Sequence, residues 1–127
     1  MTDQDKKNIA TAFITALRAR DAQGFHAIMS DDVVWSLPGA SLASGLAHGV
    51  EGILKRANTL VSYGVKLDIL HVVIGYEGVA LLLHNTATRD GRILDEYLTT
   101  VCTLRDQKIA RLDTYISDVP MLNSFFV

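Results

Sequence analysis

The order of the hydrophobic patterns constrains the fold of this chain more than any other feature. Two helix-like patterns come first, and the apolar segment Asp31–Gly39 follows them. A third helix-like pattern comes next, and every later pattern is typical of β-strands. Helices that precede strands in this way predict an α+β domain, with the helices packed on one face of an antiparallel sheet. A length of 127 residues is that of one domain, so residues 1–127 are expected to fold as a single unit.

The three helices are predicted to begin near Asp3, Asp21 and Val50, and the third to end at Gly64, a residue type suited to a helix C-cap. Apolar residues recur at helical spacing in each, at Ile9, Phe13, Leu17, Phe25, Ile28, Met29, Ile53, Leu54, Ala57, Leu60 and Val61. The segment Val33–Leu37 is predicted to be a strand, and the small residues from 39 to 49 to form a loop.

Four further strands are expected, at Val65–Gly75, Val79–Arg89, Arg92–Leu104 and Ile109–Asp118. Asp90–Gly91 between two extended runs is the strongest hairpin signal in the chain. A two-residue turn there places Asn85 opposite Glu96. A three-residue loop at 106–108 places Thr100 opposite Thr114, and Glu96 opposite Asp118.

Strand side chains alternate between the two faces of a sheet, and the more apolar set of each strand is expected to face the helices. The inner faces then form a cup that holds a small, largely apolar molecule. The high hydrophobic content of 49% agrees with a lined cavity or a buried subunit interface. The residues predicted to line this pocket are Phe13, Trp35, Leu37, His71, Leu98, Thr100, Cys102, Leu112 and Thr114.

Asn85, Glu96 and Asp118 form the one polar constellation that the predicted register brings together on three strands. Two carboxylates at the rim of an apolar cup repel each other, so that one of them holds a proton near neutral pH. Such a pair can act as general base and general acid, with the Asn85 amide as hydrogen-bond donor. The opposing interpretation places both carboxylates at strand ends in water, which is the commoner position for such groups.

Charge and composition argue against several other functions. The net charge is −2, the pI is about 6.0 and the basic residues are scattered, so that no surface for nucleic acid is expected. The histidines show no metal-type spacing with one another or with Cys102, and neither a metal nor a cofactor is expected. No apolar run is long enough to span a membrane, and the first residues lack the apolar core of a signal peptide. A cytoplasmic protein is therefore expected.

Three parts of the chain resemble the SnoaL-like branch of the nuclear transport factor 2-like (ketosteroid isomerase-like) superfamily. They are the segment Asp31–Gly39 between helices, the turn at 89–95, and the segment 108–112 together with Tyr115 and Asp118. The resemblance covers nearly the whole chain. It implies a curved, cystatin-like sheet wrapped on three N-terminal helices as a cone-shaped α+β barrel. It also implies a homodimer formed through the outer sheet face, whose mixed polar and aromatic composition suits such an interface.

The enzymes of that superfamily can be compared with this chain position by position. The tyrosine donor and the aspartate base of ketosteroid isomerases fall at Phe13 and Leu37, and their second aspartate falls at Thr100. The last-strand aspartate of limonene-type epoxide hydrolases falls at Thr114. The resemblance therefore implies that steroid isomerisation by the usual residues does not occur here.

Three functions remain open from the sequence. The first is acid–base catalysis of a cyclisation, an isomerisation or a hydrolysis by Asn85, Glu96 and Asp118. The second is binding of a small hydrophobic molecule without catalysis, since the catalytic groups of the related enzymes are missing. The third is an interaction module that recruits a protein partner through the outer sheet face.

Overall fold

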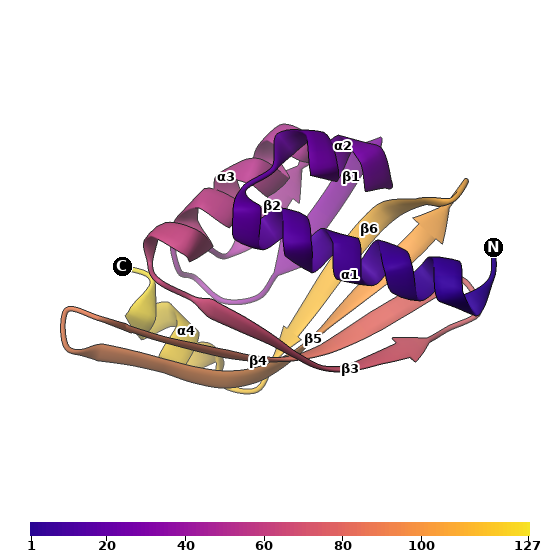
Figure 1. Cartoon of the computed structure of the whole chain (residues 1–127). Coiled ribbons are helices and arrows are strands. Elements are labelled where there is room, and N and C mark those ends of the chain that lie inside the picture. The colour runs from indigo at the N-terminus through magenta and orange to yellow at the C-terminus, as the bar shows by residue number, and fades with distance from the viewer.

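The computed structural model describes all 127 residues and contains four helices and six strands (Figure 1). The helices are α1 (Asp3–Ala19), α2 (Ala22–Ile28), α3 (Gly49–Ser62) and α4 (Val119–Phe125). The strands are β1 (Met29–Leu37), β2 (Gly45–His48), β3 (Lys66–Ile74), β4 (Gly78–Arg89), β5 (Arg92–Arg105) and β6 (Lys108–Ile116).

The six strands form one curved, unclosed sheet in the order β2-β1-β6-β5-β4-β3. Neighbouring strands are antiparallel except β1 and β6, which run parallel. The expectation of a purely antiparallel sheet is therefore wrong at this one pair. Strands β1 and β2 form one edge of the sheet, and α3 then carries the chain to the opposite edge at β3. Strands β4, β5 and β6 follow back across the sheet, so that β6 lies beside β1 and runs parallel to it.

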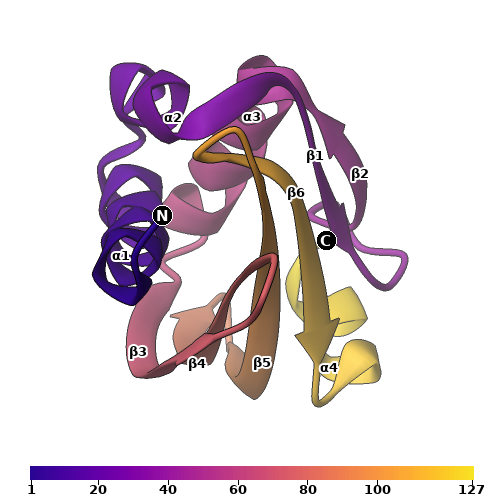
Figure 2. The same ribbon diagram turned by 90° about the vertical axis from the view of Figure 1, so that its right-hand side faces the viewer.

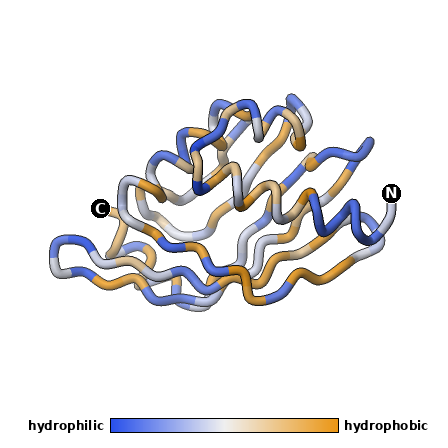
Figure 3. Tube along the Cα trace, viewed as in Figure 1, coloured by the Kyte–Doolittle hydropathy of each residue, from blue (hydrophilic) through white to orange (hydrophobic).

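Helices α1, α2 and α3 cover one side of the sheet, and the sheet curves around them (Figures 1 and 2). The predicted α+β layers are thus confirmed. The apolar stretches of the chain run through the strands and the helix faces turned to them, while the tip of the β4–β5 hairpin is hydrophilic (Figure 3). The helices and the inner sheet face share one continuous hydrophobic core.

Helix α1 shows how local sequence and core burial agree. Thr2 and Asp5 form a capping box, in which each side chain accepts a hydrogen bond from the other residue's backbone N–H. The apolar face of the helix buries Phe13, Ile14 and Leu17 against the sheet. Phe13 meets Trp35 of β1 edge-on, with ring centroids 5.5 Å apart.

The β4–β5 hairpin has the register predicted from its turn. Asp90 and Gly91 have φ angles of 50° and 77°, which only glycine and a few polar residues adopt readily, and Arg89 pairs with Arg92. The pairing continues without interruption along both strands, and Asn85 lies opposite Glu96.

The β5–β6 pairing has the predicted register at Thr100 and Thr114, but a shorter turn and a bulge produce it. Arg105 pairs with Lys108, so the turn has two residues rather than three. A bulge between Thr103 and Leu104 then adds the missing residue. As a result Thr100 faces Thr114, as predicted.

Several predicted boundaries are wrong. Met29 belongs to β1 rather than to the second helix, and residues 45–48, expected in a loop, pair with β1 as edge strand β2. The C-terminal tail forms a fourth helix, α4, that the sequence patterns did not predict. Asp118 caps its start by accepting a hydrogen bond from the Met121 N–H.

Candidate functional site

A small interior cavity lies between α1, the inner face of the sheet and α4. Fifteen of its eighteen lining residues are hydrophobic, and the polar ones are Asn85, Glu96 and Thr100. Water-sized spheres can occupy about 20 Å³ within it. A site of that size has room for about one water molecule.

Asn85 and Glu96 form the polar end of this cavity. Their side chains come from paired positions on β4 and β5, and they are 5% and 2% exposed. Asn85 Oδ1 and Glu96 Oε2 are both buried without any hydrogen-bond partner in the protein. Native proteins leave few buried polar atoms unpaired, and those that remain mark sites where a water molecule, an ion or a ligand supplies the missing bond.

Burial raises the pKa of Glu96 from 4.5 to about 7. Loss of solvation in the apolar cavity is the larger cause, and the negative charge of Asp118 is the smaller one. The carboxyl group has no salt bridge with a cation to offset these effects. A carboxylic acid with this pKa exchanges a proton at neutral pH, which an ordinary glutamate does not.

Asp118 lies beyond the end of β6, where it begins α4 and remains half-buried. The hydrogen bond from the Ser117 N–H to the Tyr97 carbonyl continues the β5–β6 register to this point. Asp118 is therefore next to Glu96, although its carboxylate accepts the Met121 N–H instead of facing Glu96 as a strand partner. The predicted strand pairing of Glu96 with Asp118 is therefore wrong, because β6 ends at Ile116 and Asp118 caps α4. The raised pKa of Glu96 was attributed to repulsion between the two carboxyl groups, but burial is the larger cause.

A chain of three hydrogen-bonding side chains borders the cavity at Thr100. The indole N–H of Trp35 donates to Thr114 Oγ1 over 2.8 Å, and Thr114 Oγ1 is 2.9 Å from Thr100 Oγ1. All three residues are buried. Trp35 and Thr100 line the cavity, whereas Thr114 lies behind them and joins the two.

Arg56 contacts Trp35 but does not line the cavity. Its guanidinium lies 4.8 Å from the centroid of the indole ring, and it donates to the backbone carbonyls of Trp35 and Gly45. Arg56 is 7% exposed and has no carboxylate partner, and burial lowers its pKa to about 10. Sequence reasoning missed this residue. Its signal is a charged position within the apolar stripe of α3, between Ile53 and Leu60.

Helix α4 closes the cavity. Leu122 and Phe126 are buried and line it, and Phe126 packs against Tyr63 with ring centroids 5.2 Å apart. The Tyr63 hydroxyl also donates to the Val127 carbonyl over 2.7 Å. Asp118 as N-cap, with Pro120 in the first turn, was the signal that could have predicted this helix.

The pocket residues expected from the sequence divide into three groups. Phe13, Trp35, Leu37, Leu98 and Thr100 line the cavity. A second group is buried in the core without lining it, and its members are Cys102, Leu112 and Thr114. His71 is exposed, so its expected place in the pocket is wrong. A bulge between Ile69 and His71 reverses the facing of β3 beyond that point.

Two further features bear on other kinds of site. No three His, Cys, Asp or Glu side chains gather where they could hold a metal ion. None of the helices combines the length and apolar character that crossing a membrane requires.

The fold is shared with many solved structures. Bal32a from a soil-derived mobile gene cassette is 20% identical, with a TM-score of 0.89 over 98% of both chains. TerC, crystallised with polyporic acid, is 20% identical, with a TM-score of 0.81 over 96% of this chain and 98% of its own. IdmH from Streptomyces antibioticus, a candidate polyketide cyclase, is 19% identical, with a TM-score of 0.73 over 96% of this chain and 99% of its own. At these identities the likeness shows the fold alone.

The comparison with curated protein sequences found no match. The sequence model of the SnoaL-like domain matches residues 10–112, which is most of the chain and includes β1, Asn85, Glu96 and Thr100. Solved relatives described as having NTF2-like and cystatin-like folds agree with this match. The chain therefore belongs to the SnoaL-like domain family, and it shares its fold with solved structures described as NTF2-like and cystatin-like.

Proposed function

We propose that this protein is an enzyme that performs acid–base chemistry on a small, largely apolar molecule, with Glu96 as the group that transfers the proton. One observation carries the proposal. Glu96 is almost completely buried, has an unpaired Oε2 and has a pKa of about 7. A buried carboxyl group without a partner costs stability, and such groups are found most often where a reaction requires them.

The cavity gives each neighbouring group a role in such a reaction. Ionised Glu96 accepts a proton from carbon or from a hydroxyl group, and protonated Glu96 returns it at a second position. The Asn85 amide, directly opposite, binds the oxygen atom or the water molecule that gains or loses charge. Asp118 acts on Glu96 through its negative charge, because it disfavours a second charge nearby. The apolar lining strengthens these interactions because it excludes water.

The reaction classes that suit this arrangement are cyclisation, isomerisation and hydrolysis. Each needs a proton removed at one position and delivered at another. That one solved relative is a candidate polyketide cyclase supports the first class.

The proposal is tested by a thermal-shift screen against aromatic polyketides, terpenoid epoxides, steroids and fatty acids, with product analysis by mass spectrometry for every compound that raises the melting temperature. Glu96→Gln keeps the shape of the side chain but cannot transfer a proton. It is expected to bind the same compounds and to lower turnover about a hundredfold or more. Turnover that is unchanged in Glu96→Gln and Asp118→Asn would refute the assignment.

Ligand binding without catalysis is the second candidate. The positions at which ketosteroid isomerases carry functional groups hold Phe13, Leu37 and Thr100 here, and the cavity is otherwise apolar. In this case Trp35→Ala is expected to abolish ligand binding, whereas no compound is converted by the wild-type protein.

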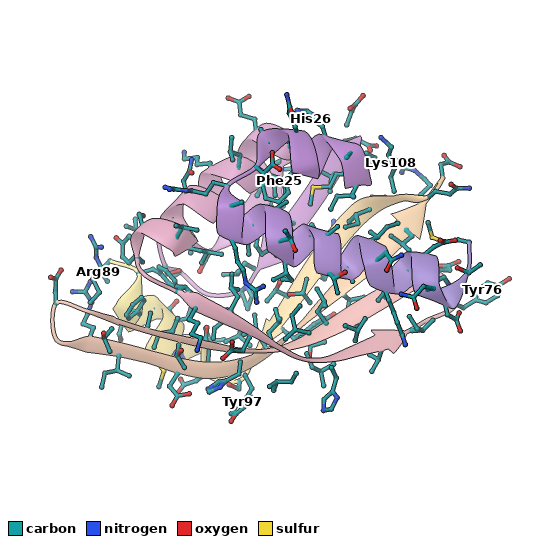
Figure 4. The ribbon with its side chains drawn as sticks, viewed as in Figure 1. Phe25, His26, Tyr76, Arg89, Tyr97 and Lys108 are labelled. Atoms are coloured by element: carbon teal, nitrogen blue, oxygen red, sulfur yellow. The ribbon has the colours of Figure 1, made fainter.

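The outer face of the sheet supports a homodimer as a separate proposal. Tyr97 points away from the helices, and Ile93, Tyr97 and Tyr115 on this face are 58% to 65% exposed (Figure 4). Exposed apolar side chains on one sheet face are typical of subunit interfaces. Sedimentation velocity tests the proposal, because a Tyr97→Asp substitution is expected to convert a dimer into a monomer. A wild-type protein that sediments as a monomer would favour the interaction with another protein instead.

A further inference from the structure

A groove opens on the surface between edge strand β2 and helix α3, which pack side by side (Figure 2). Its volume is about 230 Å³, against the roughly 30 Å³ that one water molecule occupies in the liquid. Its lining has only Ala43 in common with that of the interior cavity, so the groove is a separate site. It has room for a small molecule of several heavy atoms.

The charged side chains of this groove are all basic. His48, Lys55 and Arg56 line it, and no Asp or Glu does. Neither Lys55 nor Arg56 takes part in a salt bridge. The groove is therefore positive, although the whole chain has a net charge of −2. A local charge opposite in sign to that of the molecule attracts anions to this one place.

Arg56 is the most deeply buried of these basic residues, with 7% of its surface exposed. Burial lowers its pKa to about 10, because the charged form loses solvation. Charged side chains buried to this extent are normally paired with an opposite charge, and the backbone carbonyls that Arg56 bonds carry no full charge. A negatively charged group in the groove offsets that cost.

The hydrogen-bonding groups of the groove are mostly donors. A guanidinium has five N–H groups, and the bonds from Arg56 to the carbonyls of Trp35 and Gly45 use two of them. The remaining N–H groups add to the three donors of the Lys55 ammonium. A group with acceptor oxygens only, such as an ionised carboxylate or a phosphate, matches this set of donors.

The rim of the groove is apolar. Leu42 and Leu46 line it and are 68% and 60% exposed. Large apolar side chains so exposed beside basic groups suit a ligand that has an apolar part as well as an anionic one.

We propose that the groove between β2 and α3 binds a small organic anion, with its carboxylate or phosphate group at Arg56 and Lys55 and its apolar part against Leu42 and Leu46. This site is separate from Glu96 and does not depend on the proposed acid–base function. The Arg56 guanidinium lies 4.8 Å from the centroid of the Trp35 indole, and Trp35 is the only tryptophan. An anion at Arg56 is therefore expected to change the fluorescence of Trp35.

The test compares hexanoate and hexyl phosphate with neutral hexanamide and with inorganic phosphate. Binding is measured by isothermal titration calorimetry, and the emission of Trp35 is recorded alongside. The proteins are wild type, Arg56→Lys, Lys55→Gln, Lys55→Arg and Lys7→Gln. Lys55→Gln removes one exposed charge from the groove, and Lys55→Arg keeps that charge. Lys7→Gln removes an exposed charge from α1, outside the groove, and is the matched control.

Hexanoate and hexyl phosphate are expected to bind wild type and to change Trp35 emission, and hexanamide to bind about tenfold more weakly or less. Inorganic phosphate is expected to bind more weakly than hexyl phosphate, because it lacks the apolar part. Lys55→Gln should weaken binding of both organic anions about fivefold, whereas Lys55→Arg and Lys7→Gln should bind as wild type does. Arg56→Lys should weaken binding about tenfold, because it loses the forked donors. The tighter of the two organic anions identifies the head group.

Three results would overturn the proposal. The first is that neither organic anion binds wild type. The second is that hexanamide binds as tightly as hexanoate, which places the ligand at an apolar site instead. The third is that Lys55→Gln and Lys7→Gln weaken binding equally, which shows an effect of net charge alone. Glu96 does not line the groove, so none of these results bears on its proposed role, which the turnover of Glu96→Gln tests separately.

Discussion

Asn85 and Glu96 face each other across β4 and β5, and each keeps one buried oxygen atom without a hydrogen-bond partner. Two neighbouring acceptors left unpaired in an apolar cavity are costly to a fold. The rest of the core follows ordinary packing, with aromatic and aliphatic side chains filling the space between helices and sheet. The cost is therefore confined to the polar end of the cavity.

Glu96 is expected to make stability depend on pH. Its pKa in the folded protein is about 7, above the ordinary value of 4.5, so the folded state holds the proton more tightly than the unfolded state. Stability is then highest below the unfolded pKa and falls as the pH rises through the folded one, by about 3 kcal/mol in total. Glu96→Gln lacks this titration. The free energy of unfolding in urea should therefore fall less for Glu96→Gln than for wild type as the pH is raised from acidic to alkaline. Free energies of unfolding that change equally with pH in both proteins would contradict the expectation.

Asp118→Asn is expected to lower the pKa of Glu96 while leaving α4 in place. Asparagine caps helices about as well as aspartate, so only the charge is removed. Because burial is the larger cause of the raised pKa, the value should move only part of the way to 4.5. Asp118→Ala serves as the comparison, since it removes the cap as well and should cost about 1 kcal/mol of stability. A pKa of Glu96 that does not change in Asp118→Asn would show that the two groups do not interact.

Leu122→Ala is expected to open the cavity. Leu122 is 2% exposed and lines the cavity from α4, so its truncation should cost about 2–5 kcal/mol. Trp35 is the only tryptophan and borders the same cavity, so its fluorescence reports access to the interior. Quenching by acrylamide should increase in Leu122→Ala. Val127→Ala, at an exposed position of the same tail, should change neither property, and equal quenching in both variants would argue against α4 as the closing element.

Arg56→Lys is expected to destabilise the protein by about 1–3 kcal/mol. A lysine ammonium cannot bond the carbonyls of Trp35 and Gly45 in the same forked geometry or cover the indole face as a planar guanidinium does. The emission of Trp35 should also change, because its neighbour is replaced. Lys55→Gln removes a charge from the exposed neighbouring position and should stay within about 0.5 kcal/mol of wild type. Equal stability of the two variants would contradict the supporting role of Arg56.

The parts of the fold that sequence patterns predicted correctly are those set by local chemistry. The Asp90–Gly91 turn determines the whole β4–β5 register, and with it the opposition of Asn85 and Glu96. Alternation then identifies Glu96, Leu98 and Thr100 as inward-facing, since a one-residue slip would turn the apolar set of β5 to solvent.

The parts that sequence patterns missed depend on contacts between distant segments. The bulge that turns His71 outward, and the one between Thr103 and Leu104, leave no clear signal in the local sequence. Helix α4 has only seven residues and is too short to form alone, so its stability comes from packing Leu122 and Phe126 over the cavity. The size of the cavity follows from that packing, which explains why the open cup expected from the strands is closed.

The pKa of the Glu96 carboxyl group tests the central claim most directly. Carbon-13 NMR of the side-chain carboxyl, assigned by its loss in Glu96→Gln, measures it without knowledge of any substrate. A midpoint near 7 is the result that the buried, unpaired carboxyl group predicts. A midpoint near the ordinary value of 4.5 would show that Glu96 is ionised and solvated at neutral pH, and would contradict its proposed role in proton transfer.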